Sequence, residues 1–364
     1  MRIGIDIWYL SKPHSSIGKI LINTLECWRR NKKDEVEIVL FGTDNPHIKS
    51  YQNYFDIVII PTRNILRFYW KLNKKARKEQ VDLFFFPFDI APFYSENYAL
   101  MVHDLIFLKL ERNVKNFFFS ILVRNAIRKA KVIITPSKFT KEEIVKTYKI
   151  EGRKIQELPL GIDPIFRKVS IQEAMDRIYK LNLLPHQVIE NGFILHVGRI
   201  RPAYKNLNRL LRAYVDCKDV IKKYLVIVST DKPSKGDEKI IRKFKEDIIL
   251  LHDIPEDVLV LLYNLSDFFV YPSLYEGFGM SAVEAMACGK PLIVSNIPPF
   301  REVVGDAGVF FNPLDVNSLR EAIINLSLNE ALREKLSKKA EERAKIFTWE
   351  NFSEKLLRIL ISCA

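Results

Sequence analysis

The stretch YPSLYEGFGMSAVEAMACGKP, residues 271–291, determines the fold that we expect for this chain. It follows an apolar run that is typical of a buried strand. Gly277 and Gly279 flank Phe278 and permit backbone conformations that other residues avoid. A helix is expected to begin near Met280. The sequence therefore predicts a strand, a tight turn and a helix whose first free N–H groups can bind an anion such as phosphate.

Two glutamates accompany this turn. Glu276 lies before the predicted helix and Glu284 lies just over one turn inside it, so both side chains can face one ligand. Carboxylates beside an anion site do not bind the phosphate itself, and they suit hydroxyl groups such as those of a sugar or a ribose. The pair therefore predicts a ligand that carries both phosphate and hydroxyl groups.

The full string resembles the E-x7-E motif of retaining glycosyltransferases of family 4, which have the GT-B fold, through residues 276–284 and the following GKPLIVS at 289–295. The alternative is a glycine-containing strand-to-helix turn of some other α/β domain. The resemblance implies two facing Rossmann-like α/β domains with an interdomain cleft. It assigns contacts with the nucleotide-sugar donor to Glu276, Gly277, Phe278, Gly279, Met280 and Glu284.

A second strand, loop and helix follow one another from residue 193. The loop carries Arg199 and Lys205, and it resembles the G-R-x5-K-N element with which the family holds the donor diphosphate. Arg201 lies in the same loop, which leaves open which arginine acts, and the alternative is a set of surface cations. Arginine and lysine can neutralise a leaving diphosphate without a metal. Because the chain has no D-x-D motif, we expect no metal and no cofactor.

A polar pair ends the predicted strand at residues 99–105. His103 and Asp104 stand at its carboxyl end, which is where open α/β sheets bind their ligands. The family often places a His-Asp pair here on the acceptor side, so the resemblance assigns catalytic roles to His103 and Asp104 together with Glu276. The alternative is a histidine satisfied by the local backbone. Near the N-terminus the family's loop is usually glycine-rich, and here it keeps only Gly18, which we assign to the donor.

The chain of 364 residues is long enough for two domains. We expect an acceptor domain at residues 1–180, a linker at 181–192 and a donor domain at 192–348. The last helix, 349–364, is expected to pack back on the first domain, as is common in this fold. The four scattered cysteines argue against a disulfide framework or a zinc site. We expect no signal peptide, no transmembrane helix and a cytoplasmic location.

The net charge of +13 is unevenly distributed. Residues 1–180 carry 32 Lys and Arg against 20 Asp and Glu, and the remainder is nearly neutral. This asymmetry suggests an anionic partner, such as a membrane surface, a charged acceptor or nucleic acid, whereas the alternative is a basic face that aids solubility. Nucleic acid is the poorer candidate because no aromatic-and-basic binding motif accompanies the charge. On the predicted helix 114–131, Arg124, Arg128 and Lys131 form a basic stripe. The stripe indicates either a helix that docks on a membrane or a buried core helix with one solvent-exposed edge.

The resemblance implies a retaining enzyme that moves a hexose of mannose or glucose type. Its donor would be a nucleotide sugar such as GDP-mannose or UDP-glucose, and its acceptor a glycan or a lipid-linked saccharide, with the protein peripheral at a membrane. One alternative is a degenerate transferase that binds a membrane or nucleic acid through its basic half. Another is an enzyme of the same fold that hydrolyses or epimerises nucleotide sugars, and a requirement for an acceptor would separate it from a transferase.

Overall fold

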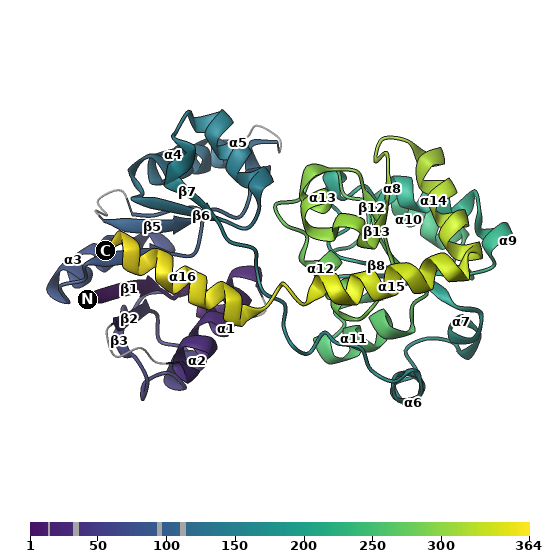
Figure 1. Ribbon diagram of the computed structural model, residues 1–364, viewed down its shortest axis with the longest axis horizontal. Helices are drawn as coiled ribbons and strands as arrows, with labels where there is room; N and C mark the ends of the chain where they lie inside the picture. Colours follow the sequence, from purple (N-terminus) through teal and green to yellow (C-terminus); the bar gives the residue numbers. More distant parts are fainter. Residues whose placement is uncertain (14, 32–35, 93–96, 110–113) are drawn as a thin grey trace. The chain divides into compact units, whose positions relative to one another are not determined.

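The computed structural model describes all residues except 14, 32–35, 93–96 and 110–113. The chain divides into two compact α/β units (Figure 1). The first unit comprises Met1–Gly161 and Thr348–Ala364, and the second comprises Ile162–Phe347. Both units contain a parallel sheet, which confirms the expected fold class.

The first sheet has seven parallel strands in the order β3-β2-β1-β4-β5-β6-β7. Its strands are short and mostly buried, as all-parallel sheets require. The order reverses between β1 and β4, where the carboxyl ends of the strands leave room for a ligand. The strands are β1 (Arg2–Asp6), β2 (Glu37–Gly42), β3 (Asp56–Ile59), β4 (Leu83–Phe86), β5 (Tyr98–Met101), β6 (Val132–Thr135) and β7 (Ile155–Glu157).

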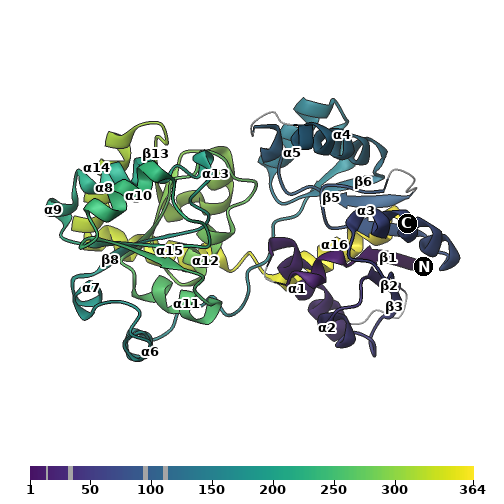
Figure 2. The same ribbon diagram turned by 180° about the vertical axis from the view of Figure 1, so that it is seen from behind.

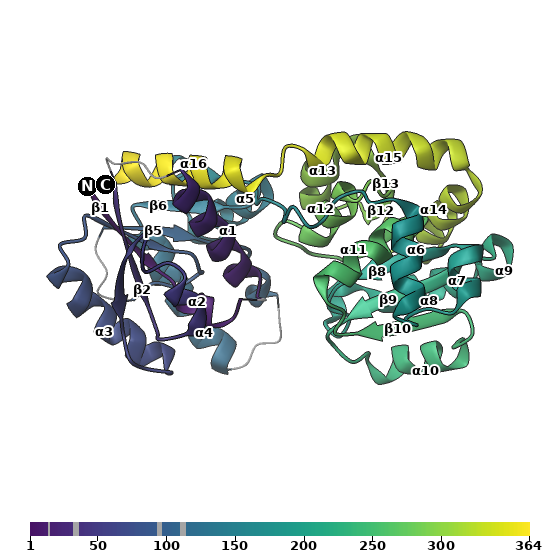
Figure 3. The same cartoon turned by 90° about the horizontal axis from the view of Figure 1, so that it is seen from below.

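Helices cover both faces of this first sheet. Figure 3 shows α16 along one side of the unit, with α3 and α4 on the opposite side. The C-terminal helix packs on α1, where the Trp28 indole N–H donates to the Ser353 carbonyl at 3.0 Å. The helices are α1 (Ser16–Arg30), α2 (Pro46–Lys49), α3 (Ile65–Lys78), α4 (Val114–Lys129), α5 (Lys138–Tyr148) and α16 (Trp349–Cys363), with 3-10 turns η1 (Trp8–Ser11), η2 (Ile106–Leu108) and η3 (Gly152–Lys154).

The second sheet has six parallel strands in the order β10-β9-β8-β11-β12-β13. This is the 3-2-1-4-5-6 order of doubly wound nucleotide-binding folds, and it reverses between β8 and β11. The strands are β8 (Phe193–Val197), β9 (Tyr224–Ser229), β10 (Ile248–His252), β11 (Phe268–Tyr271), β12 (Leu292–Ser295) and β13 (Gly308–Phe311).

The second unit is covered by helices on both faces of its sheet (Figure 2). They are α6 (Ile171–Lys180), α7 (His186–Asn191), α8 (Leu207–Val215), α9 (Lys218–Ile221), α10 (Lys235–Lys243), α11 (Glu256–Leu265), α12 (Met280–Ala287), α13 (Pro298–Val304), α14 (Val316–Leu328) and α15 (Glu330–Ala344), with 3-10 turns η4 (Ala203–Lys205) and η5 (Gly305–Ala307). None of the helices that the structure describes has the length and apolar character needed to cross a bilayer.

The boundary between the units differs from the one that we expected. It falls at Gly161 rather than at residue 180, because α6 packs against α11 of the second unit. The expected linker at 181–192 contains the helix α7. The proline and the glycine of this segment favour a connection, but the residues between them form the helix His186–Asn191.

Candidate functional site

Two loops meet where the strand order of the second unit reverses. The loop after β8 supplies Lys205, and the loop after β11 supplies Glu276. The Lys205 ammonium donates to Glu276 Oε1 at 2.6 Å, and the two side chains are only 11% and 12% exposed. The same ammonium lies 5.6 Å from the centre of the Tyr271 ring, within the range of a cation–π contact. The carboxyl edge of this sheet therefore holds a buried pair of opposite charges.

Asn206 fixes the position of the lysine beside it. Its backbone is left-handed, with φ at 63°, and its side-chain amide donates to the carbonyls of Pro272 and Pro313, both at 2.9 Å. The amide thus ties the loop after β8 to the loops after β11 and β13. Asn206 belongs to the Lys-Asn dipeptide of the expected diphosphate element, but the sequence does not indicate which loops its amide joins.

The turn before α12 needs glycine at position 279. Gly279 has φ at 101°, and a Cβ built there would lie 2.7 Å from a ring carbon of Phe300. The adjacent Phe278 is buried and packs edge-on against Phe347, with ring centres 5.7 Å apart. The helix begins at Met280, as the sequence predicts. Phe278 therefore has a packing role in this turn, which positions the start of the helix.

Glu284 lies inside α12 and is 8% exposed. Its Oε2 accepts a hydrogen bond from the Tyr263 hydroxyl at 3.0 Å. Burial, reinforced by the charge of Glu284, raises the pKa of Tyr263 well above its usual value, so the phenol remains a donor. This hydrogen bond orients one oxygen of the carboxylate. Tyr263 lies on a different helix, α11, and nothing in its local sequence marks it as a partner of Glu284.

His196 lies in β8 below the charged pair and is fully buried. Its Nδ1 is 2.9 Å from the Val270 carbonyl, which can only accept, so Nδ1 carries the proton. Burial, together with the charge of Lys205, lowers the pKa of His196 to about 4. The imidazole is therefore neutral at physiological pH and adds no second positive charge beneath Lys205.

Three buried polar atoms of this region have no hydrogen-bond partner within the described part of the chain: His196 Nε2, Ser273 Oγ and Ser295 Oγ. They come from β8, from the loop after β11 and from the end of β12, which are neighbouring strands of the sheet. Most buried polar atoms of proteins are paired, so unpaired ones need an explanation. Their gathering next to the carboxyl edge fits a polar site there.

Arg199 also lies at this edge. Its Nε donates to Asp231 Oδ2 at 3.0 Å, and the arginine side chain is 63% exposed, against 16% for the aspartate. The ion pair holds the guanidinium near the carboxyl end of β9, which is the strand that precedes Asp231. Arg201, the other arginine of the loop, is exposed.

The remaining predicted residues lie in the first unit. His103 follows β5, and its backbone N–H donates to Asp89 Oδ1 at 2.9 Å. Its ring Nε2 is 2.9 Å from the Pro87 carbonyl, which can only accept, so Nε2 carries a proton. Asp104 accepts a hydrogen bond from the Ile106 N–H at 2.8 Å, which begins the turn η2. The loops after β4 and β5 thus hold each other at the carboxyl edge.

Gly18 has a packing reason for being glycine. It lies in the first turn of α1, and a Cβ built there would be 2.3 Å from the Lys12 carbonyl oxygen. Any side chain would push the preceding loop away from the helix. This contact explains the glycine by packing, and the assignment of Gly18 to the donor stays a prediction.

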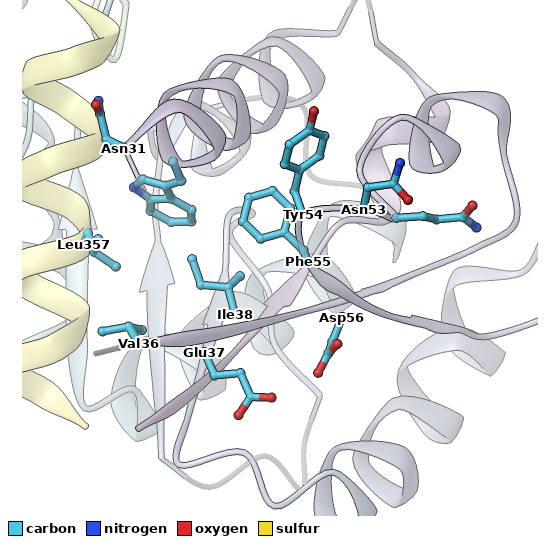
Figure 4. Close-up of a pocket in the computed structure, with 11 residues that line it drawn as sticks. Asn31, Val36, Glu37, Ile38, Asn53, Tyr54, Phe55, Asp56 and Leu357 are labelled. Carbon is cyan, nitrogen blue, oxygen red and sulfur yellow. The ribbon is translucent and has the colours of Figure 1, made fainter. Parts of the chain in front are cut away.

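A cavity of about 330 Å³ lies in the first unit, between α1, α16 and the amino ends of β2 and β3 (Figure 4). Two carboxylates line it, and Arg2 pairs with both, at 3.3 Å to Glu37 and 3.0 Å to Asp56. The cavity is at the edge of the sheet opposite to His103. Because Arg2 neutralises its carboxylates, we assign it no role in the chemistry.

No group of three or more His, Cys, Asp or Glu side chains that could hold a metal ion occurs among the described residues. The candidate site of the second unit is thus a cation–carboxylate pair with a second carboxylate beside it, at the start of a helix. Such a set can bind an anion and hydroxyl groups together.

Comparison with known families gives two matches that together span most of the chain. Residues 18–166 match the family described as Glycosyltransferase Family 4, and residues 180–343 match Glycosyl transferases group 1. The O-antigen chain mannosyltransferase B of Escherichia coli is 31% identical over 63% of this chain and 60% of the relative. The O-antigen chain mannosyltransferase RfbU of Salmonella typhimurium is 28% identical over 63% of this chain and 61% of the relative. The alignments thus span about three fifths of these relatives.

Solved structures share the whole fold at low sequence identity. Sucrose-phosphate synthase from Thermosynechococcus elongatus superimposes with a TM-score of 0.75 at 19% identity, and all of both chains is covered. The HepE protein of Anabaena in complex with UDP-glucose gives a TM-score of 0.76 at 17% identity, again over all of both chains. At these identities the likeness shows the fold, which is that of GT-B glycosyltransferases.

Proposed function

Because the chain belongs to the glycosyltransferases of family 4, we propose that it transfers a hexose from a nucleoside diphosphate sugar to a hydroxyl group of a glycan acceptor. The buried Lys205–Glu276 pair, with Glu284 oriented by Tyr263, is the observation that carries this proposal. It places one cation and two carboxylates at the switch point of the second sheet. A nucleoside diphosphate sugar offers both an anionic diphosphate and the hydroxyl groups that these side chains would bind.

In the proposed mechanism, the diphosphate lies against Lys205, Arg199 and the first N–H groups of α12. Glu284 accepts hydrogen bonds from ribose hydroxyls, and Glu276 accepts them from the hexose. The bond between the anomeric carbon and the diphosphate oxygen breaks while the acceptor oxygen forms the new bond on the same face, so the configuration is retained. The proton of the acceptor hydroxyl leaves with the diphosphate. The two cations stabilise the charge that develops on the leaving group.

We propose that this stabilisation needs no divalent metal. Lys205 is already at the site, and Arg199 is exposed at the same edge with only one of its nitrogens shown in an ion pair. Membership in glycosyltransferase family 4 also supports the proposal that the anomeric configuration is retained. Transfer should continue when a chelator is in excess, and activity that is lost with the chelator and restored by magnesium or manganese would contradict the proposal.

GDP-mannose is the first donor to test, because the relatives named above are mannosyltransferases. UDP-glucose is the second, because HepE was solved with it. A ligand that binds only the folded state raises the melting temperature, so a thermal-shift screen of GDP- and UDP-sugars identifies the donor. Transfer is then measured with and without glycan acceptors. Release of nucleotide at the same rate without an acceptor would identify a hydrolase instead.

The acceptor that we propose is a lipid-linked saccharide at the cytoplasmic face of a membrane. The first unit holds 30 Lys and Arg against 19 Asp and Glu, whereas the second holds 27 against 25. The excess of positive charge is thus in the unit to which we assign the acceptor. Anionic lipids attract such a unit with a strength that falls as salt is added.

A further inference from the structure

Two helices of the first unit expose large apolar side chains. On α3, Leu66 is 70% and Trp70 is 75% exposed. On α4, Phe117 is 63%, Phe118 is 61% and Ile121 is 42% exposed. The predicted helix at 114–131 is therefore not a core helix with one solvent-exposed basic edge, because it also exposes apolar side chains. Apolar side chains that gather at a surface indicate an interaction site.

Cations follow these apolar residues along the same helix faces. On α3, Leu66 and Trp70 continue into Lys74 and Arg77 with the spacing of one helix face. Neither helix contains an aspartate or a glutamate. On α4, the corresponding face carries Phe117, Ile121, Arg124 and Arg128. Each helix therefore exposes large apolar side chains in its first half and most of its exposed cations in its second half. Arg67 of α3 is an exposed cation that lies next to Leu66 in the first half.

The topology places the apolar halves of both helices toward the same end of the first unit. Phe68, Tyr69 and Leu72 of α3 share a core cluster with Val123, Ala126 and Ile127 of α4, so both helices cover the same face of the sheet (Figure 3). Each helix follows a parallel strand and precedes the next one, so both begin at the carboxyl edge. The exposed apolar residues thus lie toward the edge that carries His103, and most of the exposed basic residues lie about 12 Å farther along each helix.

We propose that the outward faces of α3 and α4 form a docking surface for an anionic phospholipid bilayer. The tryptophan, phenylalanine, leucine and isoleucine side chains enter the boundary between headgroups and acyl chains, and the cations contact the anionic headgroups. This deepens the proposed function and rests on it in one respect: the carboxyl edge with His103 would tilt toward the bilayer, where a lipid-linked acceptor is held.

The distribution of side chains favours a bilayer over other partners. Aromatic and aliphatic residues that enter the interface, next to lysine and arginine, are the pattern of helices that lie on a membrane. The absence of carboxylates from both helices makes the whole surface complementary to anionic headgroups. Single-stranded nucleic acid needs a basic groove along its backbone with aromatic side chains on which successive bases stack, whereas most exposed cations of α3 and α4 lie beyond the exposed aromatic residues along each helix.

Trp70 provides a direct test. The other three tryptophans, Trp8, Trp28 and Trp349, are 9%, 5% and 4% exposed, so a change of environment at the surface is reported by Trp70. Vesicles of phosphatidylcholine with phosphatidylglycerol should shift its emission to the blue, and vesicles of phosphatidylcholine alone should do so far less. High salt should weaken the binding, and Trp70→Phe should remove most of the shift while the protein still sediments with the vesicles.

Substitutions can distinguish binding by this surface from binding by the overall positive charge of the protein. Arg67→Gln, Lys74→Gln and Arg77→Gln together should weaken binding to the anionic vesicles about a hundredfold, because each cation contributes about a factor of five. Phe117→Ser with Phe118→Ser should also weaken it. The matched control replaces three exposed lysines of the second unit, Lys239, Lys335 and Lys338, by Gln and should bind like the parent.

Several results would overturn the proposal. They are equal binding by the two triple variants, no shift of Trp70 with anionic vesicles, a shift that depends on protein concentration without vesicles, or the same shift with single-stranded RNA. The third would assign the surface to a second copy of the chain, and the fourth to nucleic acid. All measurements omit donor and acceptor, so failure here is distinct from failure of transfer to a water-soluble glycan.

Discussion

The two units have the same strand order around their switch points but different chemistry there. In the second unit, Lys205 meets Glu276, and the pair is nearly buried. In the first unit, the corresponding strands end near two buried carboxylates, Asp6 and Asp89. Burial raises the pKa of Asp6 to about 7 and that of Asp89 to about 6. One sheet edge is thus built around a pair of opposite charges and the other around carboxylates that burial tends to keep protonated.

This contrast separates what topology determines from what side chains determine. In both units the reversal of strand order leaves the carboxyl ends of two strands open to a ligand. Among the residues that the structure describes, a buried cation between two such loops occurs at the edge of the second unit, where Lys205 lies, and this edge suits a diphosphate. The first unit carries the basic surface on its helices instead. Single substitutions at the edge of the second unit should therefore weaken the binding of the anionic donor. Single substitutions at the edge of the first unit should instead change the pH dependence of stability or the rate of sugar transfer.

Loss of the cation should have the largest effect. Lys205→Met removes the ammonium from Glu276 and from the leaving group, and it should cost about 2–4 kcal/mol of transition-state stabilisation, seen as a fall in kcat. Because the variant also leaves Glu276 unpaired, thermal unfolding is measured in parallel. The double variant with Glu276→Gln should recover stability without recovering activity. Recovery of both would show that the pair serves only the fold.

Glu284→Gln should weaken nucleotide binding by about 2 kcal/mol, because hydrogen bonds to a charged group contribute about 1.5–3 kcal/mol. Titration calorimetry with GDP and with UDP measures this loss. Tyr263→Phe is the matched control: it removes the phenol that orients Glu284 but keeps the carboxylate, so its effect should be smaller. Equal nucleotide affinity in all three proteins would take Glu284 out of the donor site.

The sequence predicted those parts of the site that depend on neighbours along the chain. The start of α12 at Met280 agrees with its predicted position, because the glycines before it specify the turn locally. The Lys205–Glu276 pair joins residues 71 positions apart and exists only because β8 and β11 are neighbours. Tyr263 could not be predicted for the same reason.

The exposed phenylalanines of α4 show a different limit. An apolar residue in a helix predicts burial only if the helix has one apolar face, and α4 is apolar on nearly all sides. Which of its phenylalanines face the core was decided by the docking of the helix on the sheet. Phe119 packs on Phe107, with ring centres 5.0 Å apart, while its neighbours Phe117 and Phe118 are exposed.

The pH dependence of stability tests the carboxylate edge. The raised pKa of Asp6 means that the folded state holds its proton more tightly than the unfolded state, so stability falls as pH rises from about 4 to about 7. Asp6→Asn cannot ionise, and its amide oxygen can still accept the Trp8 N–H. Relative to the parent, it should gain about 1.4 kcal/mol between pH 5 and pH 6. Denaturant unfolding at both pH values measures this gain.

Asp44→Asn, at an exposed position of the same unit, is the control and should show no comparable gain. A parent protein whose stability relative to Asp6→Asn stays constant across this range would show that Asp6 is ionised throughout. The buried edge of the first unit would then need a cation, as in the second unit, and the comparison between the two sheets would lose its basis.

The smallest effect should come from His103→Ala. The backbone N–H that binds Asp89 remains in the variant, so the loop after β5 keeps its position and only the imidazole is lost. A single neutral hydrogen bond contributes about 1 kcal/mol, which corresponds to a fivefold fall in kcat/KM. Nucleotide affinity should not change, because the donor contacts are proposed for the second unit.

The control is His47→Ala, which removes an exposed histidine of the first unit and should transfer sugar like the parent. If His103→Ala also did so, the polar pair after β5 would serve only to connect the loops, as the bond of its ring to the Pro87 carbonyl allows.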